Sequence, residues 1–280
     1  LHDALPILLA GGCVRDSLLG RVPTDFDIAT DASFEQVAAL FPQALEVGRS
    51  FGVAIIPFAV GIQIEVASFR ADLDYKDGRR PEGIRYSTPQ EDARRRDFTI
   101  NALFMNPETG EIIDYVGGQA DLAAQILRAV GDPELRFTED KLRILRCVRF
   151  ASQLDFAIEH DTMAAVRRLA ATTVVVSRER IRDEIEKIIL SPRPADGLKM
   201  LVEVGLLRAL FPELTAALAT FAELERGMSG MSEESWFALW RWIQSQSQSQ
   251  SQSQSQSQSQ TSGARYDSLA AAAAAEPVDE

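Results

Sequence analysis

The sequence predicts an α+β protein in which an N-terminal mixed β-sheet head is followed by a region built of helices. Up to about residue 120, short apolar runs separated by glycines and prolines are typical of strands. From about residue 121 onward, apolar residues recur at helical spacing. The chain has 280 residues, 46% of them hydrophobic, which is enough for more than one core. We expect a head at 1–120, helical regions at 121–190 and 191–243, and a low-complexity tail at 244–280.

The first elements of the head enclose a glycine turn. The apolar run 7–10 predicts a strand that ends at Gly11 and Gly12, and the helical spacing that follows stops at Gly20. The segment 24–30 predicts a second strand, because apolar and polar residues alternate along it.

A helix and a hairpin follow in the head. Ser33 and Gln36 have the spacing of a capping box, which predicts that a helix begins between them. The apolar segments 53–60 and 62–69 predict a β-hairpin. Pro57 cannot donate a ladder hydrogen bond, so it indicates an edge or a bulge in the first arm.

Beyond the head, strand signals largely vanish and apolar spacing predicts four helical segments. The last part of the chain is different, because an alternating Gln/Ser tract and six alanines cannot bury enough apolar surface to fold. We therefore predict disorder over 244–280. The predicted helical segments are 139–154, 161–171, 177–190 and 195–211.

Composition restricts the compartment and the partners. Cys13 and Cys147 are the only cysteines and neither lies in a CxxC pair, which disfavours a disulfide framework or a zinc site and indicates a reducing cytoplasm. No apolar stretch reaches the roughly 18 residues of a membrane span. The net charge of -12 argues against strong sequence-independent RNA binding, so any RNA contact must use local arginine clusters. Nothing indicates an obligate protein partner.

Two aspartates separated by one residue follow the glycine turn. In a strand, alternate residues face the same side, so Asp25 and Asp27 project together while Phe26 points into the core. Adjacent carboxylates repel one another unless a cation lies between them, and two Mg²⁺ ions of the kind used in phosphoryl transfer meet this need. Gly11 and Gly12 let backbone N–H groups approach a triphosphate at the start of the helix. Taken alone, such an aspartate pair is more often a solvated turn.

A third carboxylate supports the metal hypothesis. The apolar side chains of segment 62–66 share one face of the predicted strand, and Glu65 lies on the other face. Beside the two aspartates, its charge would be compensated by metal. The alternative is that Glu65 faces solvent on a half-exposed hairpin.

Four stretches of the chain together resemble the class II tRNA nucleotidyltransferase and bacterial poly(A) polymerase family of the polymerase β superfamily. The resemblance implies a catalytic head, a neck at 121–190 that selects the nucleotide and binds RNA, and a helical body at 191–243 that is truncated here. It also implies Mg²⁺ as cofactor, ATP and CTP as substrates, and the tRNA 3′ end as partner. The stretches are GGCVRDSLLGRVPTDFDIAT (11–30), EDARRRDFTINAL (91–103), RFTEDKLRILRCVRF (136–150) and SRERIRDEIEKIIL (177–190).

The resemblance assigns roles to residues of the head. It implies that Asp25 and Asp27 hold the Mg²⁺ ions and that Glu65 is an accessory carboxylate. It also implies that Gly12 and Arg15 contact the triphosphate.

The second stretch implies ribose contacts. Apolar neighbours anchor it, leaving Arg96, Asp97 and Asn101 available to ribose hydroxyls or phosphate, which suits their donors and acceptors. We expect Arg94 and Arg95 to be solvated.

The third stretch predicts base selection. Asp140 and Arg143 lie three residues apart, so in one helix they share a face and present an acceptor beside donors. This pattern fits cytosine and adenine and rejects uracil and guanine. Arg146 and Arg149 continue the spacing and reach the triphosphate or the RNA end. Without the other stretches, ordinary surface ion pairs would be the better interpretation.

Several activities share these motifs. The segment 72–90 predicts a mobile loop, which in the family accompanies adenosine addition and so disfavours addition of C alone. Poly(A) synthesis would require an extended basic surface, of which the net charge gives no sign. We expect CCA addition, with an A-adding enzyme or a poly(A) polymerase as the first alternative and a non-catalytic RNA-binding remnant as the second.

Overall fold

The computed structural model describes residues 6–47, 53–59, 62–72 and 84–212. Contacts between residues divide the chain into a unit at 1–221 and a second unit at 222–280, and the second lies outside the described residues. The predicted disorder over 244–280 therefore also falls outside them. Within the described residues, no helix is long and apolar enough to cross a membrane.

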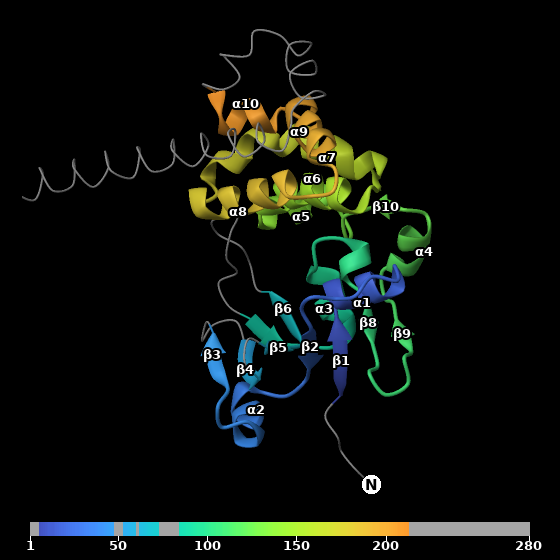
Figure 1. Cartoon of the computed structure of the whole chain (residues 1–280), viewed down its shortest axis with the longest axis vertical. Coiled ribbons are helices and arrows are strands. Elements are labelled where there is room, and N and C mark those ends of the chain that lie inside the picture. Colours follow the sequence, from blue (N-terminus) through green and yellow to red (C-terminus); the bar gives the residue numbers. More distant parts are fainter. Residues whose placement is uncertain (1–5, 48–52, 60–61, 73–83, 213–280) are drawn as a thin grey trace, which may run out of the picture. The chain divides into compact units, whose positions relative to one another are not determined.

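A mixed seven-stranded sheet forms the head, as predicted (Figure 1). Its strands lie in the order β3-β4-β5-β2-β1-β8-β9, and the β2–β5 pair is parallel while the other pairs are antiparallel. The strands are β1 (Ile7–Ala10), β2 (Asp27–Thr30), β3 (Leu45–Val47), β4 (Val53–Ala59), β5 (Ile62–Ser68), β8 (Phe104–Met105) and β9 (Ile112–Ile113).

The predicted hairpin is confirmed as β4 and β5, with a register shift between Pro57 and Ala59. Pro57 lies beyond the part of β4 that pairs with β3, so at this point β4 is an edge of the sheet, where a proline is tolerated. The second strand is shorter than predicted, because β2 begins at Asp27. Phe26 precedes it and is 46% exposed, so the prediction that this ring enters the core is wrong.

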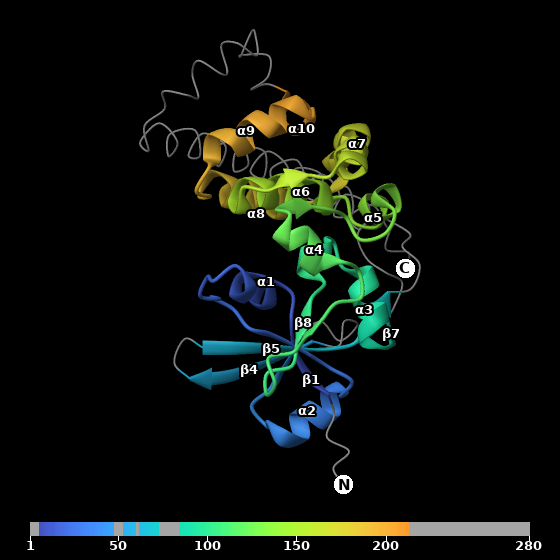
Figure 2. The ribbon, with the colours of Figure 1, turned by 90° about the vertical axis from the view of Figure 1, so that its right-hand side faces the viewer.

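Two helices flank the sheet (Figure 2). The first, α1 (Gly12–Leu18), follows the glycine turn directly. The second, α2 (Phe34–Leu40), begins at the predicted capping box, in which Gln36 N–H donates to Ser33 Oγ at 3.4 Å and Ser33 N–H donates to Gln36 Oε1 at 2.8 Å. Small and aromatic side chains from the strands and from α3 form the head core, among them Phe69, Ala93 and Phe104.

The predicted loop at 72–90 is ordered at its two ends. Strands β6 (Arg70–Asp72) and β7 (Ile84–Tyr86) pair with each other, and α3 (Pro89–Arg95) follows, while 73–83 lies outside the described residues. Local signals explain the helix, since Thr88 caps it by accepting from Glu91 N–H and Pro89 occupies its first turn.

The region that follows is almost entirely helical, as predicted (Figure 1). Two short strands interrupt it, β10 (Ile126–Leu127) and β11 (Ala157–Ile158), which pair in parallel. The predicted helix at 139–154 is divided at Asp140, and that at 195–211 is divided at Gly205, which has a left-handed φ of 81°. The helices are α4 (Gly118–Ala123), α5 (Pro133–Glu139), α6 (Leu142–Leu154), α7 (His160–Leu169), α8 (Arg178–Ile189), α9 (Pro194–Glu203) and α10 (Leu206–Leu210), with 3₁₀ turns η1 (Thr99–Asn101) and η2 (Ala170–Val175).

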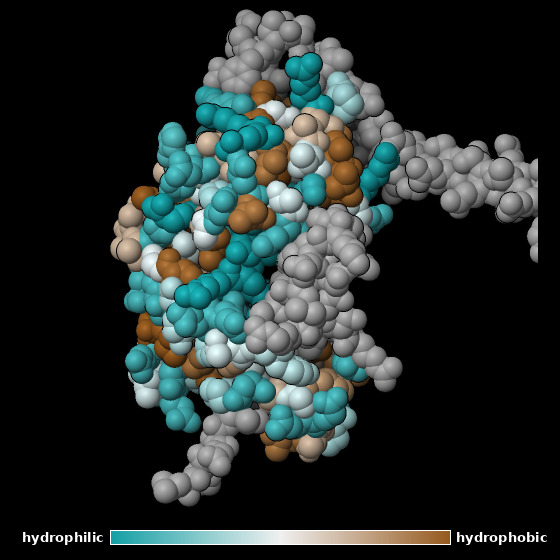
Figure 3. Space-filling view, turned by 180° about the vertical axis from the view of Figure 1, so that it is seen from behind, coloured by the Kyte–Doolittle hydropathy of each residue, from teal (hydrophilic) through white to brown (hydrophobic). Residues whose placement is uncertain are grey.

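The surface shows no single large apolar patch on the face seen in Figure 3, where hydrophobic residues are scattered in small groups among hydrophilic ones. Cys13 and Cys147 are both buried and form no disulfide with each other.

Candidate active site

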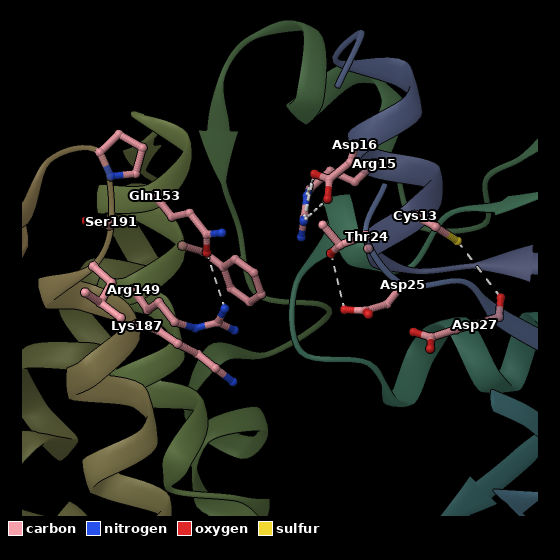
Figure 4. A pocket seen from close by; sticks show the side chains of 14 residues that line it. Cys13, Arg15, Asp16, Thr24, Asp25, Asp27, Arg149, Gln153, Lys187 and Ser191 are labelled. Carbon is pink, nitrogen blue, oxygen red and sulfur yellow. Dashed lines mark hydrogen bonds and ion pairs between the residues drawn. The ribbon is translucent and has the colours of Figure 1, made fainter. Parts of the chain in front are cut away.

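A cleft with two lobes lies where the head meets α6 and α8. The first lobe, of about 540 Å³, contains most of the residues expected to bind a nucleotide. The second, of about 430 Å³, extends toward the end of α8 and is lined there by Gln153, Lys187 and Ser191 (Figure 4). Both lobes reach Gly12, Arg15, Asp25, Asp27, Arg149 and Phe150.

The glycine turn forms the floor of the first lobe. Gly11 has φ 74°, a conformation that glycine adopts without the strain of a side chain, and its N–H donates to Leu103 O at 3.0 Å. A Cβ at Gly11 would lie 2.9 Å from Arg96 Nη1 and 3.9 Å from Asp27 Oδ2. Glycine is thus required both by the backbone conformation and by the close approach of the Arg96 guanidinium.

The three predicted carboxylates converge beside this turn. Asp27 and Glu65 are register partners on the parallel strands β2 and β5, and Asp25 lies two residues ahead of Asp27. All three residues are exposed, so Glu65 both faces solvent and lies next to Asp27. Strand alternation does not place Asp25, because that residue precedes β2.

Electrostatics within the cluster is unfavourable for three negative charges. Partial burial raises the pKa of Asp27, Arg96 counteracts this shift, and Asp25 adds to it. Burial and then the charges of Asp27 and Asp25 raise the pKa of Glu65. Among the described residues, no three His, Cys, Asp or Glu side chains form a complete metal-binding set. The cluster instead suits Mg²⁺, which is usually held by one or two carboxylates together with substrate phosphates.

A chain of hydrogen bonds connects the head to the helices. Arg15 donates to Asn101 Oδ1 at 2.6 Å, Asn101 Nδ2 donates to Asp97 Oδ1 at 3.2 Å, and Arg146 donates to Asp97 Oδ2 through Nε and Nη2 at 2.8 and 2.6 Å. Arg15, Asp97 and Asn101 are buried, so the latter two are held by neighbours rather than left free as the sequence suggested. Although burial opposes ionisation, the Arg146 guanidinium lowers the pKa of Asp97 to about 2.

The neighbouring arginines also have partners. Arg149 forms a buried ion pair with Glu184 of α8 at 2.6 Å, and its guanidinium lies 3.9 Å from the centre of the Phe150 ring. Arg95 was expected to be solvated, which is wrong, because it bonds to Asp92 Oδ1 at 2.8 Å. Arg94 is exposed, as expected.

Asp140 and Arg143 are both in the first lobe, but they do not share a helical face. Asp140 is extended, with φ -139° and ψ 105°, and accepts Leu142 N–H at 3.0 Å, so it begins α6 rather than continuing a helix. Arg143 Nη1 donates to Glu139 Oε2 at 2.7 Å and to the carbonyl of Arg136 at 3.0 Å. Its Nη2 donates to the carbonyl of Arg95 at 3.0 Å.

Sequence reasoning missed several residues of the cleft. Arg180 pairs with Asp140 at 2.8 Å, Glu184 pairs with Arg149, and Lys187 lines the second lobe. Their spacing of four and three residues places them on one face of α8, and this pattern could have identified them. Asp92 was missed because its two partners follow it closely in the sequence, as in an ordinary exposed ion pair, and its burial depends on the packing of α3 against β6.

Two family models match the chain. Residues 7–128 match the poly A polymerase head domain, and residues 155–218 match the probable RNA and SrmB-binding site of polymerase A. The chain belongs to the tRNA nucleotidyltransferase and bacterial poly(A) polymerase family. Within this family, the head match contains the glycine turn, the three carboxylates and the arginine-rich segment at 94–96.

Relatives named as CCA-adding enzymes are similar to much of this chain. The protein of Geobacillus thermodenitrificans is 44% identical over 197 residues, which covers 70% of this chain and 48% of the relative. That of Bacillus licheniformis is 42% identical over 201 residues, covering 71% of this chain and 50% of the relative. The chain thus spans about half the length of these curated relatives.

Solved structures of CCA-adding enzymes share the fold. The Bacillus stearothermophilus enzyme in complex with CTP matches with a TM-score of 0.67 and 36% identity, over 85% of this chain and 62% of that one. The Thermotoga maritima enzyme complexed with tRNA matches with a TM-score of 0.63 and 30% identity, over 75% of this chain and 49% of that one.

Proposed function

We propose that this chain carries the nucleotidyltransferase head and nucleotide-selecting helices of an enzyme that adds C and A residues from CTP and ATP to the 3′ end of tRNA. The observation that carries the proposal is the cleft, in which clustered carboxylates face a wall of arginines. The names of the relatives support the choice of CCA addition over the other activities that share these motifs.

The carboxylate cluster supports a metal-dependent reaction. Asp25 and Asp27 would hold Mg²⁺, with Glu65 beside them, because these oxygen donors lie next to the glycine turn and repel one another without a cation. When bound, such ions stabilise the charge that develops on the attacking and leaving oxygens. In the transfer, the 3′ oxygen of the RNA forms a bond to the α-phosphorus and pyrophosphate leaves.

The arginines of the first lobe would hold the triphosphate. Arg96 flanks the glycine turn beside Asp27, and Arg146 and Arg149 project from α6 into the same lobe. A guanidinium has five N–H donors, so each can keep its internal partner and still bind a phosphate oxygen. The second lobe, in which Lys187 and Gln153 lie on the wall opposite Asp25 and Asp27, would admit the RNA end (Figure 4).

Asp140 and Arg143 would read the base. Asp140 accepts from the exocyclic amine of cytosine or adenine, and Arg143 donates to the adjacent ring nitrogen. Both side chains are already fixed by other groups, Asp140 by Arg180 and Arg143 by Glu139. A fixed pair cannot rearrange to suit uracil or guanine, whose edges have the reverse pattern.

The test offers the full chain tRNAs that end at the discriminator base, at C and at CC, with each nucleotide alone and in mixtures, in the presence of Mg²⁺. Products are read at single-nucleotide resolution. We expect completion of CCA on all three tRNAs. Extension of the CC-ending tRNA alone would assign an A-adding enzyme, long adenosine tails on unrelated RNA would assign a poly(A) polymerase, and binding without extension would assign an RNA-binding remnant.

A further inference from the structure

Asp92, a buried carboxylate on α3, has no direct role in the proposed reaction. Asp92 is 1% exposed, and its Oδ1 accepts from the backbone N–H of Arg70 in β6 at 3.4 Å. Its Oδ1 forms an ion pair with Arg95 Nη2 at 2.6 Å, and its Oδ2 accepts from Arg96 Nε at 3.1 Å and Nη2 at 3.0 Å. One carboxylate therefore orients two consecutive arginines.

Only one of these two arginines lies against the carboxylate cluster. Arg95 directs its Nε to the carbonyl of Arg70, at 3.1 Å, and so toward strand β6. Arg96 directs its Nη1 to the carbonyl of Asn101, at 3.2 Å, and its guanidinium lies 5.0 Å from the centre of the Phe104 ring. Asp92 thus holds one edge of the Arg96 guanidinium. The Asn101 carbonyl accepts from its Nη1, and the Phe104 ring lies beside it.

The remaining N–H groups of Arg96 lie beside the glycine turn. Its Nη1 lies 2.9 Å from the position that a Cβ of Gly11 would take, and Asp27 Oδ2 lies 3.9 Å from the same position. Arg96 is also the cation that acts on the Asp27 carboxyl. The space beside Gly11, where another residue would have its Cβ, is therefore bordered by the Arg96 guanidinium on one side and the Asp27 carboxylate on the other.

We propose that Asp92 is a positioning residue that orients Arg96 so that its free N–H edge faces the triphosphate of the incoming nucleotide beside Asp27. The proposal rests on the proposed function, since it names a determinant of nucleotide binding at that same site. Asp92 does not touch the nucleotide. It acts by preventing rotation of a side chain that would otherwise have many rotamers, which makes the phosphate contact less costly in entropy.

The primary test compares D92N with D121N in the full chain. Asp121 is a matched control, because it is also a buried carboxylate paired with an arginine, Arg128, but lies outside both lobes of the cleft. The dissociation constant of CTP with Mg²⁺ is measured by equilibrium dialysis, and KM and kcat are measured by CMP incorporation. Both variants lose a buried charge, so both are expected to melt at lower temperature.

We expect D92N to weaken CTP binding about tenfold and to raise KM by a similar factor, and D121N to leave both within about twofold. In an R96A background, D92N should have no further effect on CTP binding, because the residue that it positions is gone. Wild-type binding of CTP by D92N, or equal weakening by D121N, overturns the proposal. CTP binding without incorporation by the wild-type chain would instead contradict the proposed function alone.

A second measurement applies if D92N does not fold. The R96A variant keeps Asp92, so added guanidinium ion should occupy the vacated position and recover at least half of the lost CTP affinity. Methylammonium, which lacks the planar fork, should recover less. Equal recovery by both ions, or recovery by neither, would show that the carboxylate does not orient a guanidinium and would refute the positioning role.

Discussion

The two walls of the cleft differ in how their charges are satisfied. On the head wall, Asp25, Asp27 and Glu65 are exposed. Partial burial and then neighbouring carboxylates raise the pKa of Glu65, and partial burial and Asp25 raise the pKa of Asp27, a shift that Arg96 opposes. On the helical wall, Arg146 and Arg149 each have an acidic partner that is at least nine-tenths buried. The head wall therefore gains most from a bound cation, whereas the helical wall is held in place before any ligand arrives.

Removal of a head-wall aspartate is the largest expected perturbation. Asp25→Ala or Asp27→Ala should reduce nucleotide transfer at least about a thousandfold, because metal binding contributes several kcal/mol to the transition state. The circular dichroism spectrum and melting temperature should change little, because both residues are exposed. Asp31→Ala, at an exposed position after the same strand, is the matched control and should keep normal turnover. Near-normal rates in both aspartate variants would exclude the metal assignment.

Asp97, the buried partner of Arg146, should affect the stability of the fold rather than nucleotide transfer. Asp97→Asn should lower the free energy of unfolding by about 2 kcal/mol at pH 7, because the native pKa of about 2 lies below the unfolded value near 4. Arg146, Arg143 and Asn101 face this carboxylate and favour its charged form. The contribution of Asp97 to the free energy of unfolding is therefore complete above pH 4 and disappears as the pH falls toward 2. Urea titrations of both proteins across this range measure it, and a pH-independent difference would contradict the ion-pair explanation.

Loss of base discrimination is a smaller effect. Arg143→Ala should relax selection against UTP and GTP by about tenfold, because the site no longer leaves a donor unpaired when the wrong edge binds. Arg136→Ala is the matched control, since Arg136 also donates to Glu139 Oε2 and to the carbonyl of Arg95 but does not line the cleft. Competition among the four nucleotides measures the ratio. Equal relaxation in both variants would mean that the base is read elsewhere.

The smallest expected effect belongs to the accessory carboxylate. Glu65→Gln should reduce transfer severalfold, because an exposed group beside Asp27 contributes less than a metal ligand. Steady-state rates at several Mg²⁺ concentrations test this. A loss as large as that of Asp27→Ala would place Glu65 among the metal ligands.

The sequence by itself determined the elements and most of the site's composition. Apolar periodicity, the glycine turn and the capping box at Ser33 depend on neighbours within a few residues, and the structure has each of them. Except for Glu65, which lines neither lobe, the residues that the resemblance selected come together in the first lobe of the cleft, although they span positions 11 to 149. Local patterns were sufficient for these features because each is set by contacts or chemistry within one segment.

Only the tertiary structure decided how the charges are paired. Asp140 begins a helix and pairs with Arg180, forty residues away, and Asp97 pairs with Arg146, which is forty-nine residues away. The burial of Asp92 and Glu184 depends on the packing of α3 against β6 and of α8 against α6. Ion pairs between distant segments leave no periodic signal in a single sequence, because a charged side chain in a helix has the same pattern whether it faces water or a buried partner.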